Sequence, residues 1–169
     1  MRHPDLPDLQ FNPDDAGDQK RFLEWSAPLM PENRAKSARL IRAAECGLTD
    51  TDYPSISIGN LSSHRAVSQK LGRDLSVLRW RTNIWLDGLA PWEEFDWIGR
   101  IIEIGEVQFE ICERVQRCLA TTANPETGLR DADTLGILQT WDHQDFCVYA
   151  RVLNTGTIHL NDSAKSPNP

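Results

Sequence analysis

The chain has 169 residues, of which 40% are hydrophobic and 25% charged, and its formal net charge is −7 at pH 7. This is enough for one domain with a hydrophobic core, and the negative charge argues against nucleic acid as a partner, because such domains usually present a basic face. We also find no apolar run near the ~20 residues of a membrane helix and no signal-peptide stretch after Met1, so we expect a cytoplasmic protein with no membrane partner.

The first residues offer little for a hydrophobic core to use. Residues 1–20 are rich in proline and aspartate, which predicts a mobile leader. Residues 22–25 suit a short helix or a packed segment before Pro28. The segment 32–46 suits a helix that ends at Gly47.

Clearer patterns begin at Ser55. Residues 55–60 read as a strand, and the next segment reads as a two-turn helix that Ser62 or Ser63 caps and Gly72 ends. Residues 78–87 alternate between apolar and polar side chains, which predicts a half-buried strand.

The second half of the chain predicts two hairpins and a short helix. Residues 100–104 and 107–113 flank Gly105-Glu106, a two-residue turn with glycine first. Asp131 or Asp133 suits the N-cap of a short helix. Residues 146–153 form another strand, which turns at 154–156 and returns through 158–160.

These elements predict a mainly β fold, a barrel or strongly curved sheet with a few short helices over its openings. We assign this barrel domain to residues 31–162, with a leader at 1–30 and a disordered tail at 163–169.

One run, from Arg117 to Gly128, carries most of the chemical information. It sets Cys118 beside an arginine, then two threonines, then the turn sequence Asn-Pro-Glu-Thr-Gly, so Cys118 should lie where a strand gives way to a loop. An adjacent arginine favours the thiolate, which is both nucleophile and metal ligand. The alternative is a small buried hydrophobe. Since no two cysteines form a C-x2-C pair, we do not expect a zinc site.

Two further patterns suggest a binding surface. Arg79, Arg81 and Asn83 would project side by side from one strand, either to grip a phosphate or heterocycle edge or as a solvated polar face. In the segment 57–63 a strand feeds a helix start, which is either an anion site or plain helix capping. We interpret a further set of residues as a solvated acidic loop: Asp87, Glu93, Glu94 and Asp96.

The motif R-C-x-x-T-T-x-x-P-x-T-G resembles the signature of the MOSC domain (molybdenum cofactor sulfurase C-terminal domain). The likeness is closer to the branch with the mitochondrial amidoxime-reducing proteins and their bacterial iron–sulfur relatives. It spans about residues 55–162 and includes the segments 56–63, 78–84, 92–105 and 156–158. The resemblance implies a β-barrel that binds the molybdenum cofactor (molybdopterin). It also implies a strand through 38–43, which we slightly favour over a helix there.

The resemblance also implies roles for individual residues. Cys118 would be the protein ligand to molybdenum and, in this role, the catalytic residue. The residues expected in the cofactor pocket are Ser57, Asn60, Ser62, Arg79, Arg81, Asn83, Gln116, Arg117, Thr121 and Tyr149. Among these, Arg117 would grip the pterin or its phosphate, and Gln116 and Thr121 would hydrogen-bond oxo or water ligands of the metal. Tyr149 has the alternative of an ordinary barrel aromatic.

By the same resemblance, the expected activity is two-electron reduction of small N-hydroxylated compounds. The electrons would come from a separate redox protein, because no four-cysteine ferredoxin pattern follows Asp162. Two alternatives stay open: a non-catalytic cofactor carrier or sulfur-transfer module that uses a Cys118 persulfide, and a folded remnant with a structural cysteine.

The chain departs from the family pattern in two places. Only about 50 residues precede the likeness, whereas members of this branch carry a β-rich N-terminal domain that helps to enclose the cofactor. Residues 1–30 would then be the remnant of such a domain. Gly59 stands where a bulkier residue is expected.

Overall fold

The computed structural model describes residues 1–42 and 49–165, which fall into two compact units, Met1–Cys46 and Gly47–Pro169. The first unit contains helix α1 (Ala16–Ser26) and a 3-10 turn, Ala27–Leu29. Asp15 caps the helix by accepting a hydrogen bond from the Asp18 amide. The N-terminal residues pack on the helix, because Phe11 stacks on Phe22 and the Trp25 indole donates to the Pro7 carbonyl at 2.6 Å.

The sequence missed much of this unit. Helix α1 includes residues 22–25, where we expected a short helix or a packed segment, but it begins at Ala16, within the stretch 1–20 that we expected to be a mobile leader. The strand expected at 38–43 does not form over residues 38–42, where Ile41 is 77% exposed and lacks a pairing strand among the described residues; Ala43 lies outside the described residues. Residues 31–42 group with the first unit, whereas the sequence suggested a boundary after residue 30.

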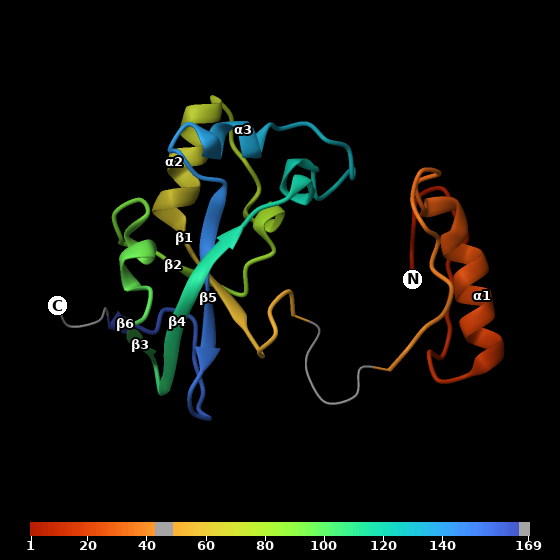
Figure 1. Ribbon diagram of the computed structural model, residues 1–169, viewed down its shortest axis with the longest axis horizontal. Helices are drawn as coiled ribbons and strands as arrows, with labels where there is room; N and C mark the ends of the chain where they lie inside the picture. Colours follow the sequence, from red (N-terminus) through yellow and green to blue (C-terminus); the bar gives the residue numbers. More distant parts are fainter. Residues whose placement is uncertain (43–48, 166–169) are drawn as a thin grey trace. The chain divides into compact units, whose positions relative to one another are not determined.

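The second unit is built on one six-stranded sheet (Figure 1). Its strands are β1 (Ile56–Asn60), β2 (Ile84–Leu86), β3 (Ile101–Ile104), β4 (Val107–Gln116), β5 (Asp145–Val152) and β6 (Ala164–Lys165). Their order is β2-β1-β5-β4-β3-β6, and all neighbours are antiparallel except β1 and β2. The sheet curves into a nearly closed, barrel-like form, so the predicted mainly β fold is confirmed.

Short helices complete this unit at one end of the sheet (Figure 1). Helix α2 (Leu61–Leu71) follows β1 directly and ends at Gly72, whose φ of 75° suits glycine. Its N-cap is Asn60 rather than Ser62 or Ser63, and it runs for 11 residues rather than two turns. Helix α3 (Thr134–Gln139) has the predicted Asp133 cap. Three 3-10 turns join the elements: η2 (Val77–Trp80), η3 (Glu93–Trp97) and η4 (Leu119–Thr122).

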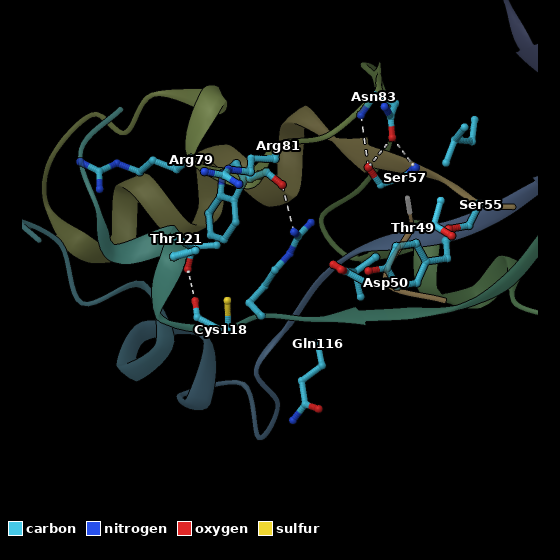
Figure 2. A pocket seen from close by; sticks show the side chains of 16 residues that line it. Thr49, Asp50, Ser55, Ser57, Arg79, Arg81, Asn83, Gln116, Cys118 and Thr121 are labelled. Atoms are coloured by element: carbon cyan, nitrogen blue, oxygen red, sulfur yellow. Dashed lines mark hydrogen bonds between the residues drawn. The ribbon is translucent and has the colours of Figure 1, made fainter. Parts of the chain in front are cut away.

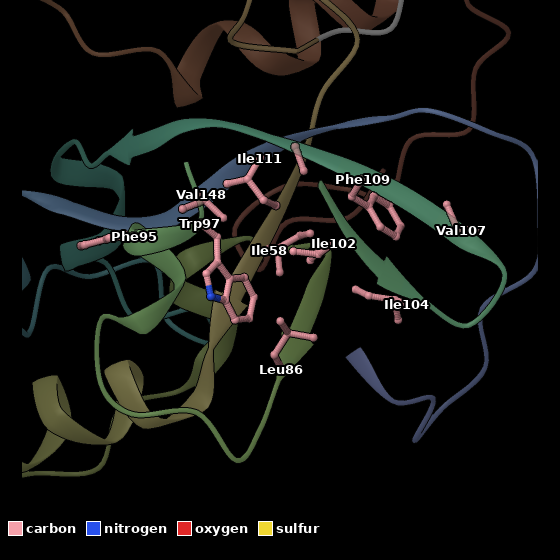
Figure 3. Packing of buried hydrophobic residues seen from close by; sticks show 11 residues of the cluster. Ile58, Leu86, Phe95, Trp97, Ile102, Ile104, Val107, Phe109, Ile111 and Val148 are labelled. Carbon is pink, nitrogen blue, oxygen red and sulfur yellow. The ribbon is translucent and has the colours of Figure 1, made fainter. Parts of the chain in front are cut away.

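Two hydrophobic clusters hold the unit together. The first fills the curve of the sheet between β1, β3, β4 and β5, with Ile58, Ile102 and Ile111 almost fully buried (Figure 3). The second lies under α2 and α3. There Trp80 stacks on Phe146 with ring centroids 3.8 Å apart, and its indole donates to His64 Nδ1 at 3.0 Å. This second cluster supports the segment that carries Cys118.

Strand β5 contains an irregularity beside the second cluster. Cys147 has a φ of 71°, and the pairing of β4 with β5 shifts register in this region. Phe146, Cys147 and Val148 are consequently all buried, although a regular strand would alternate. The Cys147 thiol accordingly lies against Gly59 and the Thr82 hydroxyl.

Three sequence predictions were wrong in this unit. Residues 78–87 are not one strand: η2 occupies 77–80, Arg81 is left-handed, and only Ile84–Leu86 pairs, because Trp80 turns into the core while Leu78 is 69% exposed. No strand forms at 158–160; the Asn154 side chain instead donates to the Glu106 carbonyl, and the chain pairs later as β6. Residues 164–165 of the expected disordered tail belong to β6, and 166–169 lie outside the described residues.

Candidate functional site

A pocket of about 500 Å³ opens beside the end of β4 (Figure 2). Four segments form it: the residues before and within β1, the η2 region, the passage from β4 into η4, and β5. Nine of the eleven predicted site residues line it, namely Ser57, Arg79, Arg81, Asn83, Gln116, Arg117, Cys118, Thr121 and Tyr149. The structure therefore brings together residues that the sequence places on four separate elements.

Cys118 lies between β4 and η4, as its turn sequence predicted, and it is exposed to solvent. Its backbone is fixed, because its carbonyl accepts from the Thr121 amide at 3.2 Å and from the Thr121 hydroxyl at 3.1 Å. The Thr121 hydroxyl also contacts the Thr134 hydroxyl of α3 at 2.7 Å. Thr121, predicted to bond ligands of a metal, thus uses its proton to hold the Cys118 backbone.

Arg117 precedes the cysteine and packs inward. Its Nε donates to the Phe146 carbonyl and its Nη1 to the Trp80 carbonyl, both at 2.9 Å, while the guanidinium lies over the two aromatic rings. Its Nη2 is buried and has no partner among the described residues. A buried N–H group at a pocket wall is costly unless a ligand accepts from it, so this atom suits an anionic or carbonyl-bearing ligand.

Arg79 is used differently from what the sequence suggested. Its side chain is only 3% exposed and forms an ion pair with Asp131 at 2.5 Å. Its Nη1 donates to the Thr122 carbonyl at 3.1 Å. The hydrogen bond from Arg79, followed by that from Asn124, holds the pKa of Asp131 below its usual range. Most of the Arg79 guanidinium is therefore committed within the protein.

Arg81 is the guanidinium left for a ligand. It is exposed, lines the pocket, and makes no ion pair or side-chain hydrogen bond with the described part of the chain. Asn83 instead braces β1, since its Oδ1 accepts from the Ser57 amide at 2.8 Å and from the Ser57 hydroxyl at 3.0 Å. The two residues share the pocket although they do not share a strand face.

Asn60 and Ser62 do not line the pocket. Asn60 is fully buried, and its amide donates to the Ala90 carbonyl at 2.7 Å and to the Glu94 carboxylate at 2.8 Å. Its Oδ1 caps α2, and the Ser62 hydroxyl accepts from Arg65. Asn60 therefore serves as the helix cap, whereas Ser62 neither lines the pocket nor supplies the cap that the sequence suggested.

Glu94 corrects the predicted solvated acidic loop. It is completely buried, and Asn60 and Ser63 donate hydrogen bonds to its carboxylate. Desolvation by burial raises the pKa of Glu94, and the hydrogen bonds from Asn60 and Ser63 partly offset the shift. Its neighbours Glu93 and Asp96 remain at the surface or partly exposed.

The far wall of the pocket holds Tyr149 and three residues that the sequence did not single out: Thr49, Asp50 and Ser55 (Figure 2). Desolvation, and then the charge of Asp50, raise the pKa of Tyr149, so its hydroxyl stays a hydrogen-bond donor at neutral pH. The segment before β1 has no periodic pattern. It folds through side-chain bonds, including that of the Thr51 hydroxyl to the Tyr53 carbonyl at 2.6 Å.

The described residues contain no group of three or more His, Cys, Asp or Glu side chains that could hold a metal ion. Cys118 is a single thiol, so a metal here would need most of its ligands from a bound organic group. The unsatisfied Arg117 Nη2 and the unpaired Arg81 suit a group that carries negative charge. The pocket thus fits a metal that arrives with an anionic organic ligand.

A comparison with protein families decides the classification: the MOSC domain model matches residues 50–165. The chain belongs to the MOSC domain family. Mitochondrial amidoxime-reducing component 1 from Danio rerio is 31% identical over 63% of this chain and 33% of its own length. The protein of the same name from Mus musculus is 25% identical over 78% of this chain and 43% of its own.

A third relative of this MOSC protein, the molybdenum cofactor sulfurase of Drosophila grimshawi, is 35% identical over 57% of this chain and 13% of its own length. The chain therefore spans less than half of each of these relatives. Among solved structures, YiiM from Geobacillus stearothermophilus matches 67% of this chain and 54% of its own, with 19% identity and a TM-score of 0.49. No helix within the described residues is long and apolar enough to cross a membrane.

Proposed function

We propose that this MOSC protein binds the molybdenum cofactor in the pocket beside β4 and reduces small N-hydroxylated compounds with electrons from a separate redox protein. The observation that carries the proposal is the exposed Cys118 on a fixed backbone, at the wall of a pocket that also holds the unpaired Arg81 guanidinium and Arg117 Nη2. The names of two relatives, both amidoxime-reducing components, support the reaction class.

The residues present fit this cofactor. A thiolate at Cys118 is a soft, anionic ligand of the kind that molybdenum in a dithiolene complex accepts. Arg117 Nη2 and Arg81 would hold anionic or carbonyl atoms of the pterin. When bound, the cofactor supplies two-electron redox chemistry and exchange of an oxygen atom.

The chain's own residues provide shape and hydrogen bonding around this group. The stacked Trp80 and Phe146 support Arg117 from beneath, so its free N–H keeps one direction. Ser57 is braced by Asn83, and Tyr149 keeps its proton on the opposite wall. Arg117, held by two backbone carbonyls, would orient a small polar substrate with little loss of side-chain freedom.

The reductase proposal is tested by turnover. Protein loaded with cofactor would be given an amidoxime and a chemically reduced dye as electron donor, and amidine formation would be followed by chromatography. We expect amidine production that depends on Cys118 and is lost in Cys118→Ala. Molybdenum-loaded protein that reduces neither amidoximes nor other N-hydroxylated compounds would contradict the reductase assignment while leaving cofactor binding intact.

The second candidate is a sulfur-transfer module, and the exposed Cys118 together with the sulfurase relative favours it. In this reaction the Cys118 thiolate takes the outer sulfur of a donor persulfide, which leaves the donor as a thiol. Trypsin releases Cys118 in the peptide 118–130, which contains no other cysteine. Mass spectrometry of this peptide after exposure to a persulfide donor decides the candidate: one added sulfur atom supports it, and an unchanged mass contradicts it.

A further inference from the structure

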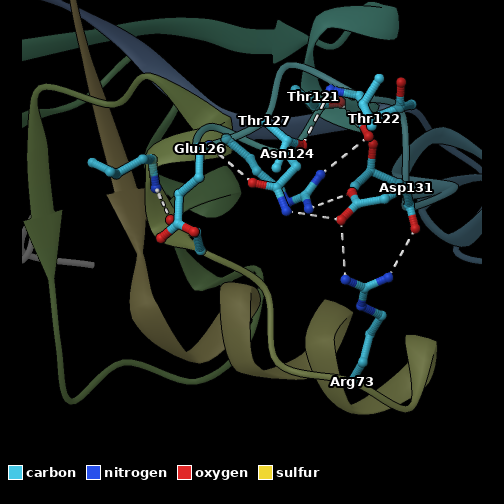
Figure 4. A network of polar contacts seen from close by, with 12 residues as sticks. Arg73, Thr121, Thr122, Asn124, Glu126, Thr127 and Asp131 are labelled. Atoms are coloured by element: carbon cyan, nitrogen blue, oxygen red, sulfur yellow. Dashed lines mark hydrogen bonds and ion pairs between the residues drawn. The ribbon is translucent and has the colours of Figure 1, made fainter. Parts of the chain in front are cut away.

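The loop that follows Cys118 is tied to the rest of the unit by an ion pair between the buried Arg79 side chain of η2 and the more exposed Asp131 (Figure 4). Asp131 follows the turn, and Thr122 lies within it. The Arg79 guanidinium binds both residues: its Nη2 donates to Asp131 Oδ1, and its Nη1 donates to the Thr122 carbonyl at 3.1 Å. The ion pair thus closes the loop that begins at Cys118.

The Thr122 carbonyl accepts several of the hydrogen bonds that close this loop. Besides Arg79, it accepts from the amides of Asp131 at 3.1 Å and Ala132 at 3.4 Å. On its other side, the Thr122 hydroxyl donates to the Leu119 carbonyl at 2.7 Å. With only 3% of its side chain exposed, Arg79 cannot swing to solvent without breaking this set. Its position therefore fixes the turn, and through the turn the Cys118 backbone.

The charges of this network do not cancel. Asp131 Oδ2 is shared by Arg73 at 3.1 Å and Asn124 at 3.0 Å, so a single carboxylate faces two guanidinium groups. Arg79 also keeps one buried N–H, at Nε, without a partner among the described residues, and it lines the same pocket as Cys118. Arg73, Arg79 and Asp131 together carry one net positive charge, and Arg79 is the member of this group that lines the pocket with Cys118.

We propose that Arg79 and Asp131 are positioning residues: together they hold the Cys118 turn in place and set the positive potential that an anionic group meets at Cys118. The idea rests on the proposed function, in which Cys118 is the group that a ligand reaches. It assigns Arg79, which lines the pocket, a role in holding the turn, whereas the sequence suggested a direct grip on the cofactor. Neither residue needs to touch a substrate.

The test uses metal-free protein, so its outcome does not depend on molybdenum binding. Alkylation of Cys118 by neutral iodoacetamide and by anionic iodoacetate would be timed at one pH through the peptide 118–130. The ratio of the iodoacetate to the iodoacetamide rate constant reports the local potential, because the thiolate fraction cancels. Loosening of the turn alone changes both rates together and leaves the ratio unchanged.

We expect Asp131→Asn to raise this ratio on the order of threefold, since it removes a negative charge, and Arg79→Gln to lower it by a similar factor. The matched control is Arg65→Gln, which removes another arginine, paired with Asp87 at 2.7 Å, that makes no hydrogen bond to the turn. This control should leave the ratio within error. Amide hydrogen exchange of the 118–130 segment should accelerate about tenfold in both network variants but not in the control.

Ratios that stay fixed, or that move in the same direction in both network variants, would overturn the proposal, as would unaltered hydrogen exchange. Should Arg79→Gln fail to fold, Asp131→Asn decides alone, because it preserves the side-chain shape. Opposite shifts in a protein that binds no molybdenum would uphold the positioning role while contradicting the proposed function.

Discussion

The Thr121 hydroxyl donates to the Cys118 carbonyl at 3.1 Å from a position that is 3% exposed, while the residue that it holds is exposed. A buried bond thus fixes the backbone of a surface cysteine. Because the Thr134 hydroxyl of α3 lies 2.7 Å from the Thr121 hydroxyl oxygen, α3 takes part in the support. The thiol can meet a ligand without reorganising its backbone, which lowers the entropic cost of binding.

Replacing Thr121 by valine tests this support. The change removes one of the two hydrogen bonds to the Cys118 carbonyl and takes the Thr121 partner from the buried Thr134 hydroxyl. We expect a loss of about 1–3 kcal/mol in the free energy of unfolding. Thr140→Val is the control, since it removes a similar hydroxyl–carbonyl bond from an exposed residue. We expect the control to cost about 0.5 kcal/mol or less. Urea unfolding measures both, and equal losses would argue against a special role for Thr121.

Arg81 should matter for binding and not for stability. It is exposed and makes no ion pair within the described residues, so Arg81→Gln should change the free energy of unfolding by about 0.5 kcal/mol or less. The same change should lower the cofactor content of purified protein several-fold, because a charge-assisted contact is lost. Arg151→Gln, which removes an arginine paired with Glu110 outside the pocket, provides the comparison. Full cofactor content in Arg81→Gln would remove Arg81 from the site.

Gly59→Ala tests the tight contact behind the pocket. An added Cβ would lie 2.9 Å from Cys147 Sγ and 3.0 Å from both the Thr82 methyl and the Trp85 ring. We expect this overpacking to cost about 1–3 kcal/mol. In a Cys147→Ala background the sulfur is gone, so the same glycine change should cost less. A thermal or urea double-mutant cycle measures the coupling, and strictly additive effects would contradict this packing.

The raised pKa of Glu94 should make the free energy of unfolding depend on pH. Burial raises its folded-state pKa above the ordinary value of 4.5, so the neutral carboxyl is favoured in the folded protein. Its stabilising contribution is therefore complete below pH 4.5 and disappears as the pH rises through the folded-state pKa. Glu94→Gln should gain stability relative to the unmodified chain between acid and neutral pH, whereas exposed Asp96→Asn should not. Unfolding free energies measured across this range give the difference, and a flat profile would disprove the effect.

Local sequence patterns correctly predicted the turns, caps and strands that depend on residues close together in the chain. The Gly105-Glu106 turn joins β3 and β4 as expected, with a φ of 56° at the glycine, and Asp133 caps α3. The strands β1 and β5 also lie close to their predicted ranges. Each of these features depends on a turn residue, a cap or an alternation within a few residues, which a sequence displays directly.

Long-range contacts decided the features that the sequence missed. The alternation at 78–87 indicates a strand, but the stacking of Trp80 on Phe146 and the pairing of Arg79 with Asp131 require a tight turn there. These partners lie 66 and 52 residues away in the chain, so no local pattern signals them. Asn60 shows the same limit, because its buried partner Glu94 lies 34 residues further on.

The most direct test of the central claim is the molybdenum and pterin content of protein purified from cells that make the cofactor. We predict near-stoichiometric metal and pterin in the unmodified chain, both lost in Cys118→Ala and both retained in Cys112→Ala, whose thiol lies on β4 outside the pocket lining. Circular dichroism would confirm that all three proteins are folded. Folded protein without molybdenum, or full metal content in Cys118→Ala, would contradict the account.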